Sequence, residues 1–222
     1  MITLFGTCRL NKISGHTNLN TMINFTHSTK EVIQMIQFIQ GVREIPAPYD
    51  MVCFRTGIMQ RTPIEYSPEF RTLFEQTDTF IVEICSRKKY VHGGYYLHHL
   101  CVDMRKPKHH HVTPADIMAE YTVEHQSDSE IEQDLIEIQS LLYPKRMIVV
   151  SHYNSKIHGK YIDSRDELIR LLQSICETHQ IPFVNPTEVL KQFPQEDVMK
   201  TDLAHYTDVG LREFSQYMDQ YV

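Results

Sequence analysis

Two groups of residues at opposite ends of the chain have the types and spacing that nucleophilic catalysis requires. Asp202 and His205 lie three residues apart in the segment 201–210, directly before a stretch with helical spacing. A carboxylate in this position can hold the imidazole in one tautomer, so that its other nitrogen acts as a general base. Cys8 follows a short apolar segment and Gly6 near the start of the chain, and its thiol is a proton donor for such a base. The sequence therefore predicts that the fold brings Cys8 and His205 together.

Each of these residues also has an ordinary structural explanation. A free cysteine is often a buried small apolar residue, and Asp202 with His205 could form only a helix cap and a surface histidine. The position of Cys8 at a strand end, in a chain that also carries Asp-x-x-His, favours the nucleophile. The neighbouring Arg9 is expected to lower the pKa of the Cys8 thiol.

Composition limits the classes of protein to which the chain can belong. Its 222 residues, 41% of them hydrophobic, suit a single domain, 1–222, with a real core. The net charge of -6 argues against a nucleic-acid partner. Five cysteines without a Cys-x-x-Cys pair favour a reduced, cytoplasmic protein. No apolar run approaches the roughly 20 residues that span a bilayer, and the first residues do not look like a secretory signal, so no membrane partner is expected.

Short apolar segments alternate with segments of helical spacing along the chain. Capping boxes at 28–31 and 164–167, and Ser-Pro at 67–68, predict helix starts. Apolar segments between the helices predict five strands, at 2–5, 51–54, 79–84, 146–150 and 181–184. Because these strands show no polar alternation, we expect a parallel sheet covered on both faces, a three-layer α/β/α sandwich. Ligands of such sheets bind at the carboxyl ends of the strands.

Residues 86–127 do not follow this alternation of apolar segments and helical patterns. They contain seven of the 13 histidines, and between Arg87 and His111 there are six Lys or Arg and one acid. We expect an inserted lid or substrate-facing loop, either merely solvated or forming an anion site. Zinc ligands could come from His98, His99, Cys101 or the run 109–111, but no ligand spacing compels a site, and no metal is assigned.

In order and spacing, these blocks resemble the SGNH (GDSL) hydrolase superfamily. The resemblance rests on Gly6-Thr-Cys8 after the first strand, Gly57 after the second, a polar turn after the third, and Asp-x-x-His followed by Tyr206, Thr207 and Gly210. It implies a flavodoxin-like sheet, acyl-ester chemistry and no permanently bound cofactor. Cys8 stands where the family usually has serine. Relatives with Gly-Ser-Cys or Gly-Asn-Cys are closer, and some are associated with polysaccharide biosynthesis and acyl transfer.

Carried across residue by residue, the resemblance makes Cys8 the nucleophile of a triad with His205 and Asp202. Backbone N–H groups of Cys8 and Gly57 would hold the oxyanion. The third block reads Cys85-Ser86-Arg87 instead of the family's Gly-x-Asn-Asp. The candidates for further oxyanion or substrate contacts are therefore Ser86, Asn154, Arg9, Arg55 and Arg87.

The expected reaction passes through a thioester on Cys8. Exchange between two thioesters is nearly balanced in energy, which favours acetyl-coenzyme A as the acyl donor, and the resemblance implies a carbohydrate acceptor. Hydrolysis of a small-molecule or carbohydrate ester is the other outcome of the same chemistry. The alternative is an inactive module that binds an anionic glycan or nucleotide. Cys8 and Cys85 could also form a reversible disulfide, although two separate thiols are the simpler expectation.

Overall fold

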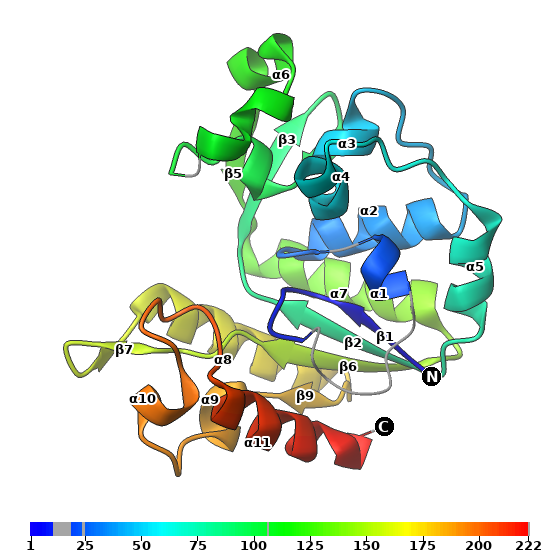
Figure 1. Cartoon of the computed structure of the whole chain (residues 1–222). Helices are drawn as coiled ribbons and strands as arrows, with labels where there is room; N and C mark the ends of the chain where they lie inside the picture. The colour runs from blue at the N-terminus through cyan, green and yellow to red at the C-terminus, as the bar shows by residue number, and fades with distance from the viewer. Residues whose placement is uncertain (11–18, 24, 106, 222) are drawn as a thin grey trace.

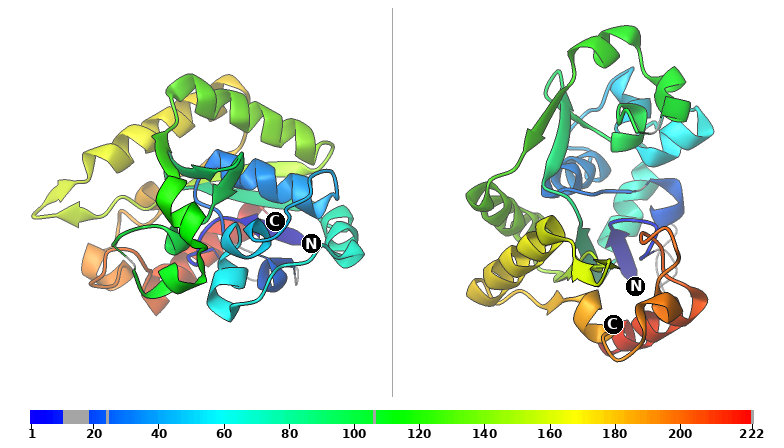
Figure 2. Two further views of the ribbon diagram at one scale, coloured as in Figure 1. Left: turned by 90° about the horizontal axis from the view of Figure 1, so that it is seen from above. Right: turned by 90° about the vertical axis from the view of Figure 1, so that its left-hand side faces the viewer.

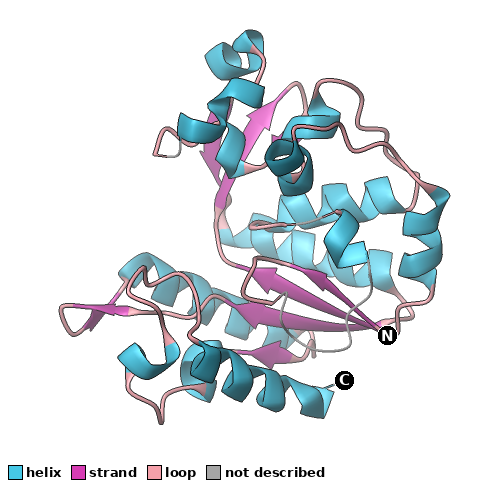
Figure 3. Cartoon of the chain, viewed as in Figure 1, coloured by secondary structure: helices cyan, strands magenta, loops and turns pink. Residues whose placement is uncertain are grey.

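A computed structural model describes residues 1–10, 19–23, 25–105 and 107–221. The sequence at 9–27 is polar and predicts a loop, and part of this segment lies outside the described residues. Four parallel strands form the central sheet, in the order β1-β2-β6-β9 (Figures 1 and 3). Their bounds are β1 (Ile2–Phe5), β2 (Thr79–Ile84), β6 (Arg146–Ser151) and β9 (Phe183–Val184).

The two faces of the sheet are both covered, because successive side chains of each strand point to opposite sides. Phe80 and Val82 belong to one apolar cluster, which packs against α2 (Thr29–Ile39), α5 (Pro68–Glu75), α7 (Asp128–Leu142) and α8 (Asp163–Thr178). Ile81 points into a second cluster under α9 (Pro186–Val189), α10 (Gln195–Val198) and α11 (Asp208–Met218). Figure 2 shows these two helical layers on either side of the strands. The expected α/β/α arrangement is confirmed.

Several helices begin where the sequence predicts. Side-chain oxygens of Ser28, Ser67 and Thr207 accept backbone N–H groups at the starts of α2, α5 and α11. The capping box predicted at 164–167 is wrong, since α8 begins one residue earlier, after Ile162. The backbone of Ile162 is held by the side chain of Asn154, which sets the entry into the helix.

The strand predicted at 51–54 is also wrong. This segment forms the short helix α3 (Tyr49–Val52) and the entry to α4 (Arg55–Gln60). Val52 and Phe54 are fully buried, but they reach the core from helical turns, and the Val52 carbonyl accepts the His98 N–H at 3.0 Å. A run of four apolar residues does not distinguish a buried strand from a buried helical turn. The described part of the central sheet therefore has four strands instead of five.

Residues 86–127 are more regular than the predicted loop. They contain an antiparallel sheet of β3 (Lys88–His92), β4 (Tyr95–Leu97) and β5 (Thr122–His125), in the order β4-β3-β5. The 3-10 helices η1 (His99–Cys101) and η2 (Pro107–Val112) and the helix α6 (Ala115–Glu120) accompany it. In Figure 1 this unit stands beyond the ends of β2 and β6, at the upper left. β3 pairs with β5 across 31 to 37 residues, a separation that no local pattern predicts, whereas β3 and β4 form a short hairpin.

The remaining elements are small. They are α1 (Leu19–Met22), the hairpin of β7 (Lys156–Ile157) and β8 (Lys160–Tyr161), and the 3-10 helix η3 (Asp219–Tyr221). None of the helices in the described ranges combines the length and apolar character that crossing a bilayer demands.

Candidate active site

A cavity of about 640 Å³ opens at the carboxyl ends of three neighbouring strands. Cys8 lines it after β1, Cys85 after β2 and His152 after β6, and His205 joins them from the segment before α11. The unit at 86–127 contributes further lining residues from η1 and η2. The described residues around the cavity include no Asp or Glu, whereas they include six histidines and three Lys or Arg. The fold thus gathers cationic and nucleophilic side chains where open α/β sheets hold their ligands.

The turn that carries Cys8 is anchored to a buried carboxylate on β2. Thr7 donates to Glu83 Oε2 from its backbone N–H at 2.7 Å and from its hydroxyl at 2.6 Å. Arg9 forms an ion pair with Glu83 Oε1 at 2.9 Å, and both side chains are almost completely buried. Gly6 is required here, because an added Cβ would lie 2.6 Å from the Glu83 Cβ. Glu83 therefore fixes the backbone on both sides of Cys8.

The Cys8 thiol is protonated at neutral pH. Partial desolvation within the cavity raises its pKa above the ordinary value of 9.0, although Arg9 acts in the opposite direction. Arg9 lowers this pKa as expected, but desolvation outweighs its effect. Glu83, the ion-pair partner of Arg9, also raises the pKa and so opposes Arg9. Reaction at this sulfur requires a base.

Asp202 and His205 form the predicted contact. Asp202 Oδ2 lies 2.7 Å from His205 Nδ1, and Oδ1 accepts the backbone N–H groups of Ala204 and His205 at 2.9 and 3.0 Å. These bonds, led by that from Ala204, lower the Asp202 pKa to about 2. An ionised carboxylate only accepts, so His205 carries its proton on Nδ1 and presents a free lone pair on Nε2. Both side chains are about half exposed.

Cys8 and His205 line the same cavity, from opposite ends of the chain. Within the described part of the chain no hydrogen bond joins their side chains. Catalytic hydrogen bonds are often long in ligand-free enzymes and close in the complex. The arrangement is therefore that of a site in which the base is oriented by Asp202 and does not yet bond the thiol.

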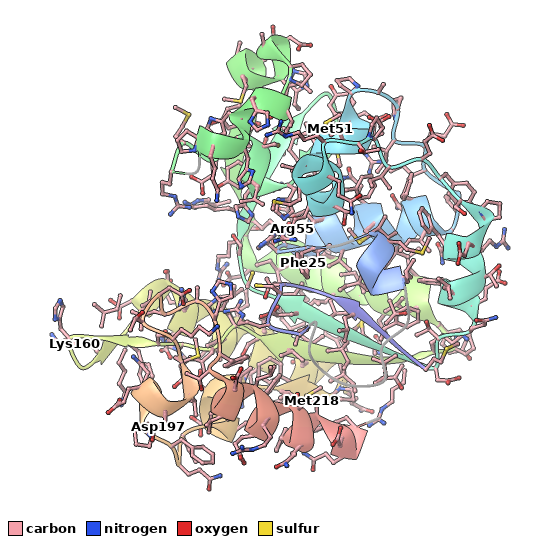
Figure 4. The ribbon with its side chains drawn as sticks, viewed as in Figure 1. Phe25, Met51, Arg55, Lys160, Asp197 and Met218 are labelled. Carbon is pink, nitrogen blue, oxygen red and sulfur yellow. The ribbon has the colours of Figure 1, made fainter. Side chains whose placement is uncertain are left out.

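Arg55 is the one predicted substrate-binding residue that faces the cavity without a carboxylate partner among the described residues. Its guanidinium lies over the ring of Phe25, 4.7 Å from the centroid, and both residues line the cavity (Figure 4). Lys108 of η2 lines it as well. These two cations are available to an anionic group of a ligand.

Three predicted contacts lie outside the cavity lining. Gly57 packs in α4 against α3, where an added Cβ would lie 2.7 Å from the Met51 carbonyl oxygen. The Ser86 hydroxyl accepts the backbone N–H of Lys88 at 2.9 Å. Asn154 is buried and bonds the backbone of Ile162. Their positions make them structural residues of turns and helix contacts.

Two predicted arginines are engaged elsewhere. Arg9 lines the cavity, but its guanidinium is occupied by Glu83, the Thr7 hydroxyl and His152 Nε2. Arg87 pairs with Asp128 at the start of α7 and does not line the cavity. The structure thus assigns both to internal ion pairs.

Glu83 and His152 are the site residues that the sequence reasoning missed. Glu83 is the one acid in the apolar strand 79–84, and a lone acid in a buried strand is the signal that was available. His152 Nδ1 donates to the Tyr153 carbonyl at 2.7 Å. Burial, with Arg9 and Arg165 adding to it, holds the His152 pKa well below 6.5. His152 is therefore neutral beside the buried ion pair.

The five cysteines are all free thiols. Cys8 and Cys85 line the same cavity, and burial raises the pKa of Cys85 well above its ordinary value. A reversible disulfide between them stays a prediction.

Comparison with known proteins gives relatives in sequence and in structure. A lipase/acylhydrolase from Enterococcus faecalis aligns with 67% of this chain and 65% of its own, at 11% identity and a TM-score of 0.40. A variant acetyl-xylooligosaccharide esterase from Geobacillus aligns with 99% of this chain and 92% of its own, at 12% identity and a TM-score of 0.42.

The Vi polysaccharide biosynthesis protein TviD of Salmonella typhi is 25% identical over 254 residues, which cover 94% of this chain and 30% of that protein. The expected similarity to a polysaccharide-biosynthesis protein is thereby confirmed. The chain spans about a third of that relative's length. The model of the TviD N-terminal domain matches residues 1–110 and 103–218, which is almost all of the sequence. The chain therefore belongs to the TviD N-terminal domain family.

Proposed function

We propose that the chain transfers an acyl group to a carbohydrate hydroxyl, with Cys8 as nucleophile, His205 as general base and Asp202 as the residue that orients it. The observation that carries this proposal is the single cavity that Cys8 shares with a histidine already oriented by a carboxylate. The relative's printed role in Vi polysaccharide biosynthesis supports a carbohydrate acceptor. Water in place of the acceptor would make the same site an esterase.

In the first step, His205 Nε2 takes the proton of the Cys8 thiol, and the sulfur attacks the carbonyl carbon of acetyl-coenzyme A. A carbon–sulfur bond to Cys8 forms as the bond to coenzyme A breaks. The departing thiolate takes the proton from the His205 imidazolium and leaves as the free thiol. The protonated resting state of Cys8 makes this base essential, because little thiolate exists at neutral pH.

In the second step, His205 takes a proton from the acceptor hydroxyl, whose oxygen attacks the thioester carbonyl. An ester bond forms, the bond to Cys8 breaks, and the proton passes from His205 back to the sulfur. In this proposal the Cys8 backbone N–H stabilises the oxyanion of both steps, which is supported by its making no backbone hydrogen bond to another described residue. Arg55 and Lys108 hold an anionic part of the donor or acceptor.

The experiment is intact-protein mass spectrometry after incubation with acetyl-coenzyme A, and separately with an activated acetate ester. The wild type is expected to gain the mass of one acetyl group. Cys8→Ala should gain none, and His205→Ala should acylate at least about 100-fold more slowly. Cys85→Ala is the matched control, since it removes another thiol from the same cavity and should acylate like the wild type. If neither donor labels Cys8, the proposal is refuted.

A second candidate is a catalytically inactive module that binds an anionic glycan or nucleotide. The observation that favours it is the cationic lining of the cavity, which has no Asp or Glu among its described residues, in a chain whose net charge is -6. In this case Arg55→Ala would weaken binding of an acidic oligosaccharide or a nucleotide, while Cys8→Ala would leave that binding unchanged. Acylation of Cys8 in the mass experiment would exclude an inactive module.

A further inference from the structure

Three histidines from two distant parts of the chain meet at the wall of the cavity. His27, His98 and His99 offer ring nitrogens that all lie within 4.8 Å of one another. The ring of His27 meets His98 and His99 edge-on, at centroid distances of 4.9 and 4.3 Å. His98 is completely buried, and the other two are half-buried. Three imidazole groups that meet at one partly buried point can supply the nitrogen ligands of a transition-metal site.

The backbone under the cluster is fixed. The His27 carbonyl accepts the N–H groups of Cys85 and Ser86, both at 3.0 Å, which ties it to the end of β2. The His98 N–H donates to the Val52 carbonyl at 3.0 Å. Tetrahedral zinc, with bonds of about 2.0 Å to nitrogen, places its nitrogens about 3.3 Å apart. The ring nitrogens, which lie within 4.8 Å of one another, must therefore approach by up to about 1.5 Å through side-chain rotation when a metal binds.

A carboxylate stands behind the cluster. Glu31 Oε2 lies 3.5 Å from His27 Nδ1, and the Ser28 hydroxyl donates to Glu31 Oε1 at 3.1 Å. Glu31 is buried, so its charge acts in a poorly solvated setting. A carboxylate on one ring nitrogen holds the proton there and leaves the other nitrogen for a metal, which is the usual arrangement around metal-bound histidine.

We propose that His27, His98 and His99 bind one divalent transition-metal ion of the zinc class. Three neutral imidazoles suit Zn²⁺, Co²⁺, Ni²⁺ or Cu²⁺, whereas Mg²⁺ and Ca²⁺ require oxygen ligands. His98 Nδ1 accepts the Leu100 N–H at 3.3 Å, and the metal takes the place of this long hydrogen bond when it binds through Nδ1. The fourth ligand is a solvent molecule from the cavity. The site shares the cavity with Cys8 and His205, and the proposed acyl transfer uses no metal in its steps.

The test uses the untagged full chain, stripped with a chelator. One equivalent of Co²⁺ is added while visible absorption is followed, because tetrahedral Co²⁺ absorbs far more strongly than the hydrated ion. Zn²⁺ affinity is then measured by competition with a chromophoric chelator. The wild type is expected to bind one ion per chain with the tetrahedral spectrum. His27→Ala and His99→Ala should each weaken Zn²⁺ binding by at least about 100-fold, and Glu31→Gln by about tenfold.

Two control variants distinguish this metal site from other metal-binding groups of the chain. The run 109–111 is the obvious place for adventitious binding, so replacing all three of its histidines by alanine should leave the affinity unchanged. Cys8→Ala removes the acyl acceptor and should also bind Zn²⁺ like the wild type, which keeps this result independent of acyl transfer. The inference is overturned if the wild type shows no tetrahedral Co²⁺ spectrum. It is also overturned if His27→Ala and His99→Ala bind as the wild type does, or if the alanine run abolishes binding.

Discussion

The buried pair of Glu83 and Arg9 offers the sharpest test of how the Cys8 turn is held. Glu83→Gln keeps the shape of the side chain but removes its charge. Arg9 would then remain buried beside His152, which is neutral and supplies no counter-charge. Removal of one partner from a buried ion pair costs about 3–5 kcal/mol, because the other charge is left uncompensated. For a chain of this size we expect the melting temperature to fall by about 6–20 °C.

Thermal and urea unfolding measure this cost, and acylation of Cys8 gives a second readout. Thr7 donates two hydrogen bonds to Glu83, and a glutamine accepts them less strongly than a carboxylate does. We therefore expect Cys8 acylation to slow by at least about tenfold at a temperature where the variant is still folded. Glu124→Gln is the matched control, because Glu124 is about half exposed and Lys89 keeps a second partner in Glu130. Its effect should stay within about 0.5 kcal/mol.

A double-mutant cycle with Arg9→Met decides whether the cost comes from the uncompensated charge. Once Arg9 is gone, loss of the Glu83 charge leaves no buried cation, so the double variant should be more stable than the sum of the single effects predicts. We expect a coupling energy above about 1 kcal/mol. Additive effects, or a Glu83→Gln variant as stable as Glu124→Gln, would refute the reasoning.

Three further predictions concern the reacting groups and the first turn of α11. Asp202→Asn should slow Cys8 acylation by about 100-fold or more, because the amide no longer enforces a proton on His205 Nδ1. Since its pKa is raised above 9.0, Cys8 should be labelled by iodoacetamide about tenfold faster per pH unit between about pH 7 and pH 9 in the His205→Ala variant. Gly210→Ala should destabilise the chain by about 1–3 kcal/mol, since its Cβ would lie 2.2 Å from the Val198 carbonyl oxygen.

Each of these has its own control. Asp219→Asn removes an exposed carboxylate near the end of the chain and should acylate normally, and equal rates in the two Asp variants would exclude the orienting role. Cys8→Ala identifies the labelled thiol, and a labelling rate that levels off below pH 8 would contradict the raised pKa. Gln216→Ala lies on the exposed side of α11. Its melting temperature is the reference for Gly210→Ala, and equal values would show that α11 shifts freely.

Features that depend only on neighbouring residues could be predicted from residue order. The contact between Asp202 and His205 spans three positions, and the caps at Ser28, Ser67 and Thr207 are equally local, so residue order was enough to predict them. The long amphipathic helices and the strands at 79–84 and 146–150 also follow from local pattern. The same reasoning predicted a strand at 51–54, and this prediction was wrong. Four apolar residues can be buried equally well in a helical turn as in a strand.

The tertiary structure decided which side chains share an environment. Arg9 and Arg55 are both arginines that follow apolar segments, yet Arg9 is buried against Glu83 and Arg55 faces the cavity. The cluster of His27 with His98 and His99 joins residues about 70 positions apart, so no spacing revealed it. The pKa of Cys8 likewise depends on how much water the folded cavity admits, which outweighs the charge of its neighbour in sequence. Burial and long-range pairing are properties of the packed chain, and they set the charge and reactivity of residues whose types the sequence already showed.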